Sequence, residues 1–296
     1  MTQFTGLGVA MVTPFTDDHK IDYAGLKKLT THLIEGGADY LVVQGTTGES
    51  PVLTKDEKRS ILDFVLEVNQ GRKPVVFGIG GNNTAEVCET LESFDATGVA
   101  GILSASPSYN KPTQEGIYAH YKALSKASSL PIILYNVPGR TGSNMSAETT
   151  LRLARDFKNI VAIKEASGNL AQIEDILEGC PADFKVISGD DGLTLAMLAL
   201  GVEGLISVVG NAFPKEYADM VHKGMFGAFH DARPIHFRFR KLIDLLFVEG
   251  NPGGVKEVLK HLGICGNAVR LPSMPVSEKT SQLIYREMAE RELVKV

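Results

Sequence analysis

One lysine stands where its side chain could bond covalently to a carbonyl compound. Lys164 directly follows the apolar run Ile160–Ile163. A lysine at the end of a buried strand loses contact with water, which favours its neutral amine. A neutral amine attacks a carbonyl carbon and forms an imine. The alternative is a lysine at the strand edge that is paired with an acid such as Glu165, because lysines are rarely buried without a partner.

Two other side chains with useful chemistry follow a second apolar run. Tyr135 ends the run Pro131–Tyr135, and its phenol could pass protons to and from an imine or a carbinolamine. The alternative is a packed core tyrosine. Arg140 follows Pro138 and Gly139, which we expect to form a rigid turn. Its guanidinium suits bidentate recognition of a carboxylate, and the alternative is a surface ion pair.

Thr46 and Thr47 lie between two glycines, Gly45 and Gly48. Glycine lets the backbone come close to a ligand, so the N–H groups of this segment could approach a carboxylate. The alternative is a simple tight turn.

The elements that must position these residues follow from the apolar pattern. Short runs rich in β-branched residues fit strands that are buried on both faces, as in a parallel sheet. These runs are Gly8–Thr13, Tyr40–Val43, Pro74–Ile79, Gly101–Ser104, Pro131–Tyr135, Ile160–Ile163, Phe184–Ile187 and Gly204–Ser207. Helical spacing lies between them, as in Tyr23–Glu35 and Lys55–Asn69. Thr54 and Glu57 form a predicted capping box for the second helix.

Eight alternations of strand and helix within residues 1–225 predict an α/β fold, a (β/α)8 TIM barrel. A doubly wound sheet is the alternative, although it usually has five or six strands. We expect residues 226–296 to form a helical C-terminal domain, with helices at Phe226–Phe247, Val255–Leu262 and Glu278–Val296. Active groups of such barrels gather where the strands end, so the candidate residues are expected to meet at one end.

The composition narrows the classes of function. With 30 Lys and Arg against 35 Asp and Glu, the net charge is −5, which argues against a nucleic-acid-binding protein. The three cysteines lie far apart, so we expect no disulfide framework. The first ten residues lack a signal-peptide pattern, and no apolar run approaches the length of a membrane span. We therefore expect a cytoplasmic protein with reduced thiols.

Seven motifs in this order resemble the pyruvate-dependent class I aldolase family, over essentially the whole chain. They are Gly45–Glu49, Ser108–Pro112, Tyr135–Gly142, Ile163–Ala166, Ser188–Asp191, Gly204–Ser207 and Asn251-Pro252. The resemblance implies condensation of pyruvate with L-aspartate-4-semialdehyde on the route to diaminopimelate and lysine. It implies no metal and no organic cofactor, and a homotetramer built as a dimer of dimers.

The resemblance also implies a role for each matching residue. Lys164 forms the imine with pyruvate, and Tyr135 is the general acid and base. Thr46 links Tyr135 to Tyr109, which the family supplies from a neighbouring subunit. The implied substrate-binding residues are Thr47 for the pyruvate carboxylate, Arg140 for the semialdehyde carboxylate, and Ile206 and Gly189 beside Lys164.

Other activities remain open from the sequence. Sugar-acid aldolases such as N-acetylneuraminate lyase resemble this chain in the lysine and tyrosine, but Arg140 favours an aldehyde that bears a carboxylate. Asp190 and Asp191 could suggest a metal-dependent enzyme, yet the seven histidines lack ligand spacing. A pyridoxal-phosphate enzyme would also use a lysine imine, and a non-catalytic barrel is the third class.

The resemblance also bears on regulation by lysine. Lysine-inhibited relatives have an effector site rich in histidine and tyrosine, whereas Lys55 and Lys58 occupy the matching segment here and Ser108 replaces a tyrosine. Asn82 and Glu86 do match. Because two cations would repel a cationic effector, we expect lysine inhibition to be weak or absent.

Overall fold

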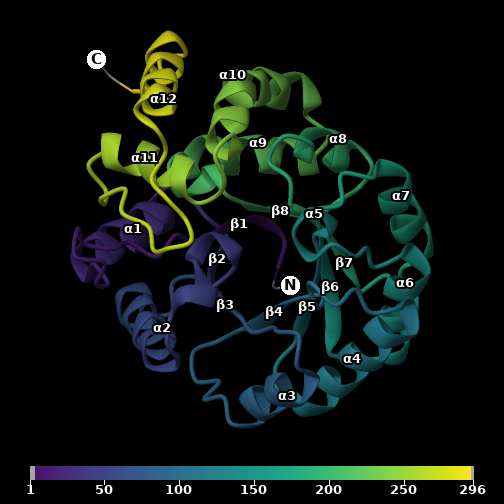
Figure 1. The fold of residues 1–296 in the computed structure, drawn as a ribbon. Coiled ribbons are helices and arrows are strands. Elements are labelled where there is room, and N and C mark those ends of the chain that lie inside the picture. The colour runs from purple at the N-terminus through teal and green to yellow at the C-terminus, as the bar shows by residue number, and fades with distance from the viewer. Residues whose placement is uncertain (1–3, 295–296) are drawn as a thin grey trace.

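The eight apolar runs form one closed barrel of parallel strands in the computed structural model, which describes residues 4–294 (Figure 1). Each strand pairs with the next, and β1 pairs with β8. The strands are β1 (Gly6–Ala10), β2 (Tyr40–Val43), β3 (Val75–Gly78), β4 (Gly101–Ala105), β5 (Ile132–Asn136), β6 (Ile160–Glu165), β7 (Lys185–Ser188) and β8 (Gly204–Ser207). Closure confirms the predicted (β/α)8 barrel and rules out an open, doubly wound sheet.

Helices surround the barrel (Figure 1). They are α1 (Tyr23–Glu35), α2 (Lys55–Asn69), α3 (Thr84–Glu92), α4 (Gln114–Ala127), α5 (Pro138–Thr141), α6 (Ala147–Asp156), α7 (Leu170–Gly179), α8 (Thr194–Ala199) and α9 (Pro214–Met225), with 3-10 turns η1 (Thr46–Gly48), η2 (Ser50–Val52) and η3 (Val209–Asn211). The predicted bounds of α1 and α2 are confirmed. So is the capping box, since the Thr54 hydroxyl accepts from the Glu57 N–H and the Glu57 carboxylate accepts from the Thr54 N–H.

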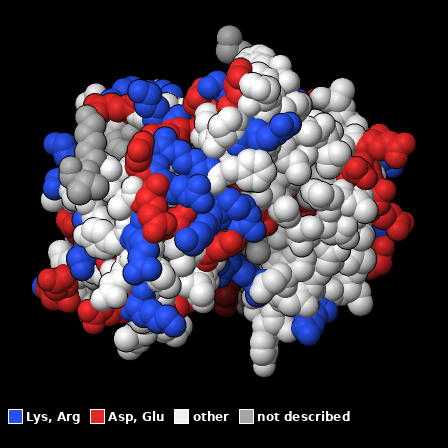
Figure 2. Space-filling model, turned by 90° about the horizontal axis from the view of Figure 1, so that it is seen from above, with Lys and Arg blue, Asp and Glu red and all other residues white. Residues whose placement is uncertain are grey.

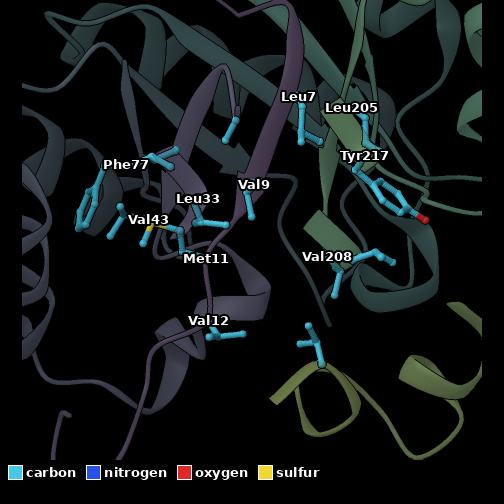
Figure 3. Packing of buried hydrophobic residues seen from close by; sticks show 14 of the residues in the cluster. Leu7, Val9, Met11, Val12, Leu33, Val43, Phe77, Leu205, Val208 and Tyr217 are labelled. Atoms are coloured by element: carbon cyan, nitrogen blue, oxygen red, sulfur yellow. The ribbon is translucent and has the colours of Figure 1, made fainter. Parts of the chain in front are cut away.

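Two hydrophobic layers result from the alternation of side chains along each strand. One layer fills the barrel and includes Ala162 of β6. The other lies between strands and helices, where Leu7 and Leu205 are register partners and pack with Tyr217 of α9 (Figure 3). Because Ala162 points into the barrel, Lys164 two residues later points inward as well.

Several element ends differ from the prediction. β6 continues through Lys164, so this lysine lies within a strand and not just after it. Arg140 lies in the short helix α5, with Pro138 at its first position, so the expected turn is a single helical turn. β1 ends before Val12, because the Val12 N–H donates to the side chain of Asn211 (3.0 Å) and leaves the strand ladder.

Three helices follow the barrel: α10 (Phe229–Phe247), α11 (Gly253–His261) and α12 (Glu278–Glu290). Phe239 of α10 packs against Phe213 and Tyr217, with ring centroids 5.1 and 5.2 Å apart. The predicted third helix is too long, because α12 ends at Glu290; the last two residues of that prediction lie outside the described residues. The domain boundary at residues 225–226 remains a prediction.

The surface on the side of α10 and α12 carries charges of both signs (Figure 2). Lys and Arg gather in a central band there, and Asp and Glu interrupt and border it. Part of this charge is paired, since Glu287 of α12 contacts both Lys241 (2.8 Å) and Arg291 (3.0 Å). Within residues 4–294, no helix has the length and hydropathy needed to cross a membrane.

Candidate active site

Lys164 lies inside the barrel beside Tyr135. The two residues are register partners on β6 and β5, and the Lys164 Nζ is 4.2 Å from the centre of the Tyr135 ring. Only 5% of Lys164 is exposed. Among the described residues, no carboxylate forms an ion pair with it. The amine therefore faces a phenol and a cavity rather than an acid.

Glu165, the alternative partner of Lys164, is bound elsewhere. Successive side chains of a strand point to opposite faces, and the Glu165 carboxylate lies outside the barrel interior. It accepts hydrogen bonds from Asn136 Nδ2 (3.1 Å), the Ser167 N–H (2.8 Å) and Gln172 Nε2 (3.2 Å). The interpretation of Lys164 as a strand-edge lysine paired with Glu165 is therefore wrong.

A cavity of about 780 Å³ opens at the carboxyl ends of the strands and reaches Lys164. Its volume is within the range of small-molecule sites. Six of the predicted site residues line it: Thr46, Thr47, Tyr135, Arg140, Lys164 and Gly189. A neighbouring cavity of about 350 Å³ shares Thr46, Tyr135 and Arg140. The barrel thus brings together residues that are far apart in the sequence.

Two predicted site residues lie elsewhere. Ile206 on β8 is buried within the barrel and does not line either cavity. Tyr109 is 89% exposed, and it also lies outside both cavities of its own chain. Its backbone has a φ of 71° and its N–H donates to the Thr141 carbonyl (3.1 Å), which fixes this exposed position.

The Thr46–Gly48 turn is held from both ends of the chain. The Thr13 hydroxyl donates to the Gly48 carbonyl (2.7 Å). Asn251 Nδ2 donates to Thr47 Oγ1 (2.9 Å). Since Thr47 Oγ1 accepts this bond, its own hydroxyl hydrogen is free to donate toward the cavity. Sequence reasoning treated Asn251 as a motif marker and a helix break, and it missed this contact.

The absence of a side chain at Gly189 leaves room for the lysine. A Cβ at this position would be 2.9 Å from Lys164 Cε and 2.8 Å from Ala166 Cβ. Carbon atoms normally approach to about 3.5–4.0 Å. Any larger residue at position 189 would therefore displace Lys164.

Asp191 connects β7 to β8 at the edge of the cavity. Its carboxylate accepts from the Ser207 hydroxyl and from the Val208 N–H (2.9 Å). Burial raises the pKa of Asp191 to about 6, although these hydrogen bonds oppose the rise. Within residues 4–294, neither Asp191 nor Asp190 belongs to a group of three or more His, Cys, Asp or Glu side chains that could hold a metal ion.

The C-terminal helices supply one wall of the cavity that sequence reasoning missed. Arg240, Ile243 and Phe247 of α10 line it, together with Asn251. Arg240 forms an ion pair with Asp244 on the same helix. No local pattern marks these positions, because they reach the site only through the packing of α10 against the barrel.

The (β/α)8 barrel buries a lysine amine next to a phenol, and an arginine lies at the cavity mouth. This arrangement is expected of a class I aldolase, which works through a lysine imine. Comparison with known proteins narrows this class. The model of the dihydrodipicolinate synthetase family matches residues 3–290, and the chain belongs to that family.

Individual relatives agree with this assignment. A 4-hydroxy-tetrahydrodipicolinate synthase of Phocaeicola vulgatus is 53% identical over 93% of this chain and 92% of its own. The crystal structure of dihydrodipicolinate synthase from Thermotoga maritima superposes with a TM-score of 0.95 at 40% identity, over 99% of this chain and 100% of that one. The enzyme from Acinetobacter baumannii, solved in complex with pyruvate, has a TM-score of 0.95 at 35% identity, over 98% and 99% of the two chains.

Proposed function

We propose that this protein condenses pyruvate with L-aspartate-4-semialdehyde to 4-hydroxy-tetrahydrodipicolinate, in the biosynthesis of diaminopimelate and lysine. One observation carries the proposal: the Lys164 amine is buried beside Tyr135 and faces a cavity with Arg140 at its mouth. The relatives described above carry the name of this synthase or were solved with pyruvate, which supports the choice of reaction.

In the first step, Lys164 Nζ attacks C2 of pyruvate. The phenol of Tyr135 protonates the hydroxyl group of the carbinolamine, which leaves as water, and a protonated imine remains. The Thr46–Thr47 turn holds the carboxylate, because the Thr47 hydroxyl is oriented by Asn251 and can donate its hydrogen. This turn and Lys164 line the same cavity, which supports the assignment.

The imine then acts as an electron sink for carbon–carbon bond formation. The methyl group of pyruvate loses a proton to give an enamine, and the enamine carbon attacks the aldehyde carbon of the semialdehyde. Arg140 binds the carboxylate of the semialdehyde with its two-pronged guanidinium. The amino group of the new chain then attacks C2, closes the ring and releases Lys164 as a free amine.

The proposed proton pathway includes a residue of a second chain. We propose that Thr46 links Tyr135 to Tyr109 of a neighbouring subunit, within a homotetramer built as a dimer of dimers. Support comes from Tyr109 itself, whose ring is exposed and lies away from its own cavity. Sedimentation velocity tests the assembly. Mixing Y109F with K164M subunits tests whether Tyr109 is shared. A mixed dimer would have one site with an intact Lys164 and a Tyr109 from the neighbouring subunit, so part of the activity should return. A cytoplasmic location also stays a prediction.

Borohydride trapping tests the chemistry directly. The protein is treated with pyruvate and sodium borohydride, and the modified peptide is mapped by mass spectrometry. We expect one adduct, at Lys164. Lys256 is an internal control, because it is also buried but is paired with Glu49. A protein without an adduct at Lys164 would refute the imine. A coupled assay with each aldehyde then separates this synthase from N-acetylneuraminate lyase.

A further inference from the structure

A buried ion pair joins the C-terminal helices to the turn that carries Thr46 and Thr47. Lys256 of α11 is fully buried, and its Nζ contacts Glu49 Oε1 at 2.5 Å and the Ala268 carbonyl at 2.7 Å. The second oxygen of Glu49 accepts from the backbone N–H of Arg270 (3.0 Å). Every polar contact that the Glu49 carboxylate makes among the described residues thus comes from the C-terminal segment.

Glu49 ends the η1 turn in a strained conformation. Its φ of 55° and ψ of 33° place it in the left-handed region, which residues other than glycine rarely adopt. Such a conformation persists only where the surroundings hold it. The Glu49 N–H also donates to the Thr46 carbonyl (3.1 Å). The side-chain anchor of Glu49 is therefore linked to Thr46 through one backbone hydrogen bond, in addition to the contacts of Thr13 and Asn251 with the same turn.

A second contact reaches the same turn from the same segment. Asn251, five residues before Lys256, donates to the Thr47 hydroxyl. This segment packs tightly against the end of α10, since a Cβ at Gly254 would be 2.4 Å from the Leu246 carbonyl. Asn251 and Lys256 thus approach the turn from a fixed support.

Stability alone does not account for this ion pair. The desolvation of two buried charges can exceed their mutual attraction, and apolar replacements of a buried pair are often neutral or stabilising. The pair links α11 to the residue that ends the η1 turn, so its contacts bear on where that turn lies.

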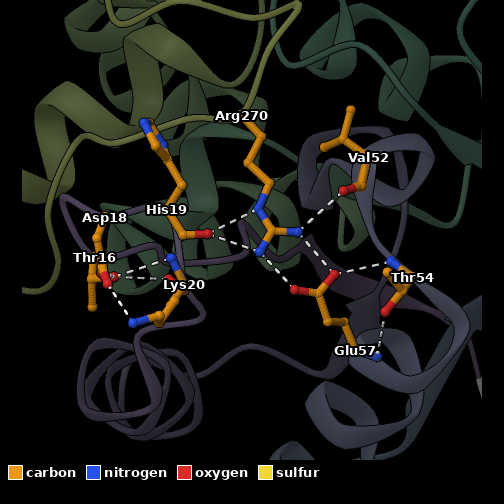
Figure 4. Close-up of polar contacts among 8 residues, drawn as sticks. All are labelled: Thr16, Asp18, His19, Lys20, Val52, Thr54, Glu57 and Arg270. Carbon is orange, nitrogen blue, oxygen red and sulfur yellow. Dashed lines mark hydrogen bonds and ion pairs between the residues drawn. The ribbon is translucent and has the colours of Figure 1, made fainter.

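The neighbouring network of Arg270 provides a contrast (Figure 4). Its guanidinium contacts Glu57 (2.6 Å) and donates to the carbonyls of Val52 (3.1 Å) and His19 (2.8 Å). These bonds join the C-terminal segment to η2, to α2 and to the loop around His19. The Arg270 side chain makes no hydrogen bond to η1, and R270M retains the backbone N–H that donates to Glu49, so this variant tests general structural loss.

We propose that Lys256 and Glu49 are positioning residues that hold the Thr46–Thr47 turn where it meets the carboxylate of pyruvate. The inference rests on the proposed function. It assigns to the C-terminal helices a part in binding the first substrate, in addition to lining the cavity with α10.

The test compares K256M and E49Q with R270M. The apparent KM for pyruvate is measured from the rate of borohydride trapping, and the KM for the semialdehyde from the coupled assay. We expect K256M and E49Q to raise the pyruvate KM by about tenfold, the loss typical of one hydrogen bond to a charged group. The KM for the semialdehyde should change less than about twofold. R270M should lower the melting temperature and leave the pyruvate KM unchanged.

The outcomes separate the proposed function from the positioning role. If the wild-type protein forms no pyruvate adduct at all, the proposed function fails. If the wild-type protein is trapped but K256M and E49Q keep its pyruvate KM, the positioning role is overturned. The same holds if R270M raises the pyruvate KM as much as they do. E49Q retains the shape of Glu49, so it decides the question if K256M does not fold.

Discussion

The contact between Gly189 and Lys164 gives a sharp prediction for the substitution Gly189→Ala. The added methyl carbon would lie 2.9 Å from Lys164 Cε and 3.1 Å from Lys164 Cγ. Because carbon atoms are in contact at about 3.5–4.0 Å, Lys164 must move by about 0.6–1 Å. Tyr135 lies on one side of the lysine and Ala166 Cβ is 2.8 Å from the same methyl, so the side chain can shift only into the cavity, away from its position beside Tyr135.

This displacement has a predictable cost. A misplacement of about 1 Å at a reacting group lowers the rate by about 10²-fold, which corresponds to about 2.7 kcal/mol of transition-state free energy. Overpacking of a filled interior costs about 1–3 kcal/mol of folding free energy. G189A should therefore fold, melt a few degrees lower, and form the pyruvate imine about 10²-fold more slowly.

The assay is the rate of borohydride trapping at saturating pyruvate, with the melting temperature measured in parallel. Gly266→Ala is the matched control, because the nearest atom to its new methyl is the Phe15 carbonyl oxygen at 3.6 Å, an ordinary contact. Trapping of G189A at the wild-type rate would refute the reasoning, since it would mean that the position of Lys164 does not limit imine formation.

Three further predictions concern the second substrate, regulation and pH. Replacing Arg140 with Met should raise the semialdehyde KM about 10-fold or more without slowing pyruvate trapping, and equal losses for both substrates would contradict its assignment. Lysine at millimolar concentration should leave the rate unchanged, because Lys55 and Lys58 line one cavity of about 570 Å³ and would repel a cationic effector there. Strong sub-millimolar inhibition would disprove this. The hydrogen bond to Asp39 raises the pKa of His222 above 6.5, so its stabilisation is complete below that pH and is lost as pH rises through the raised value. Urea unfolding from pH 5 to 9 should show this loss in the wild-type protein and not in H222Q.

Much of the fold and part of the site could be predicted from the sequence alone. Local apolar patterns in the sequence predict the strands and the first two helices. The capping box of α2 is also a local signal, because it depends on residues three positions apart. Lys164 and Tyr135 were identified because each stands at the end of a buried run. These signals are local, since a strand or helix forms mainly from the pattern of its own residues.

The tertiary structure decided which side chains meet. Lys164 and Glu165 are adjacent in sequence, yet the pleat of β6 sends the carboxylate to Gln172 and leaves the amine facing the cavity. The contact between Glu49 and Lys256 spans 207 residues, and no periodicity marks either end of it. Such contacts depend on how the barrel closes and where α10 and α11 pack against it, and this packing is a property of the whole chain.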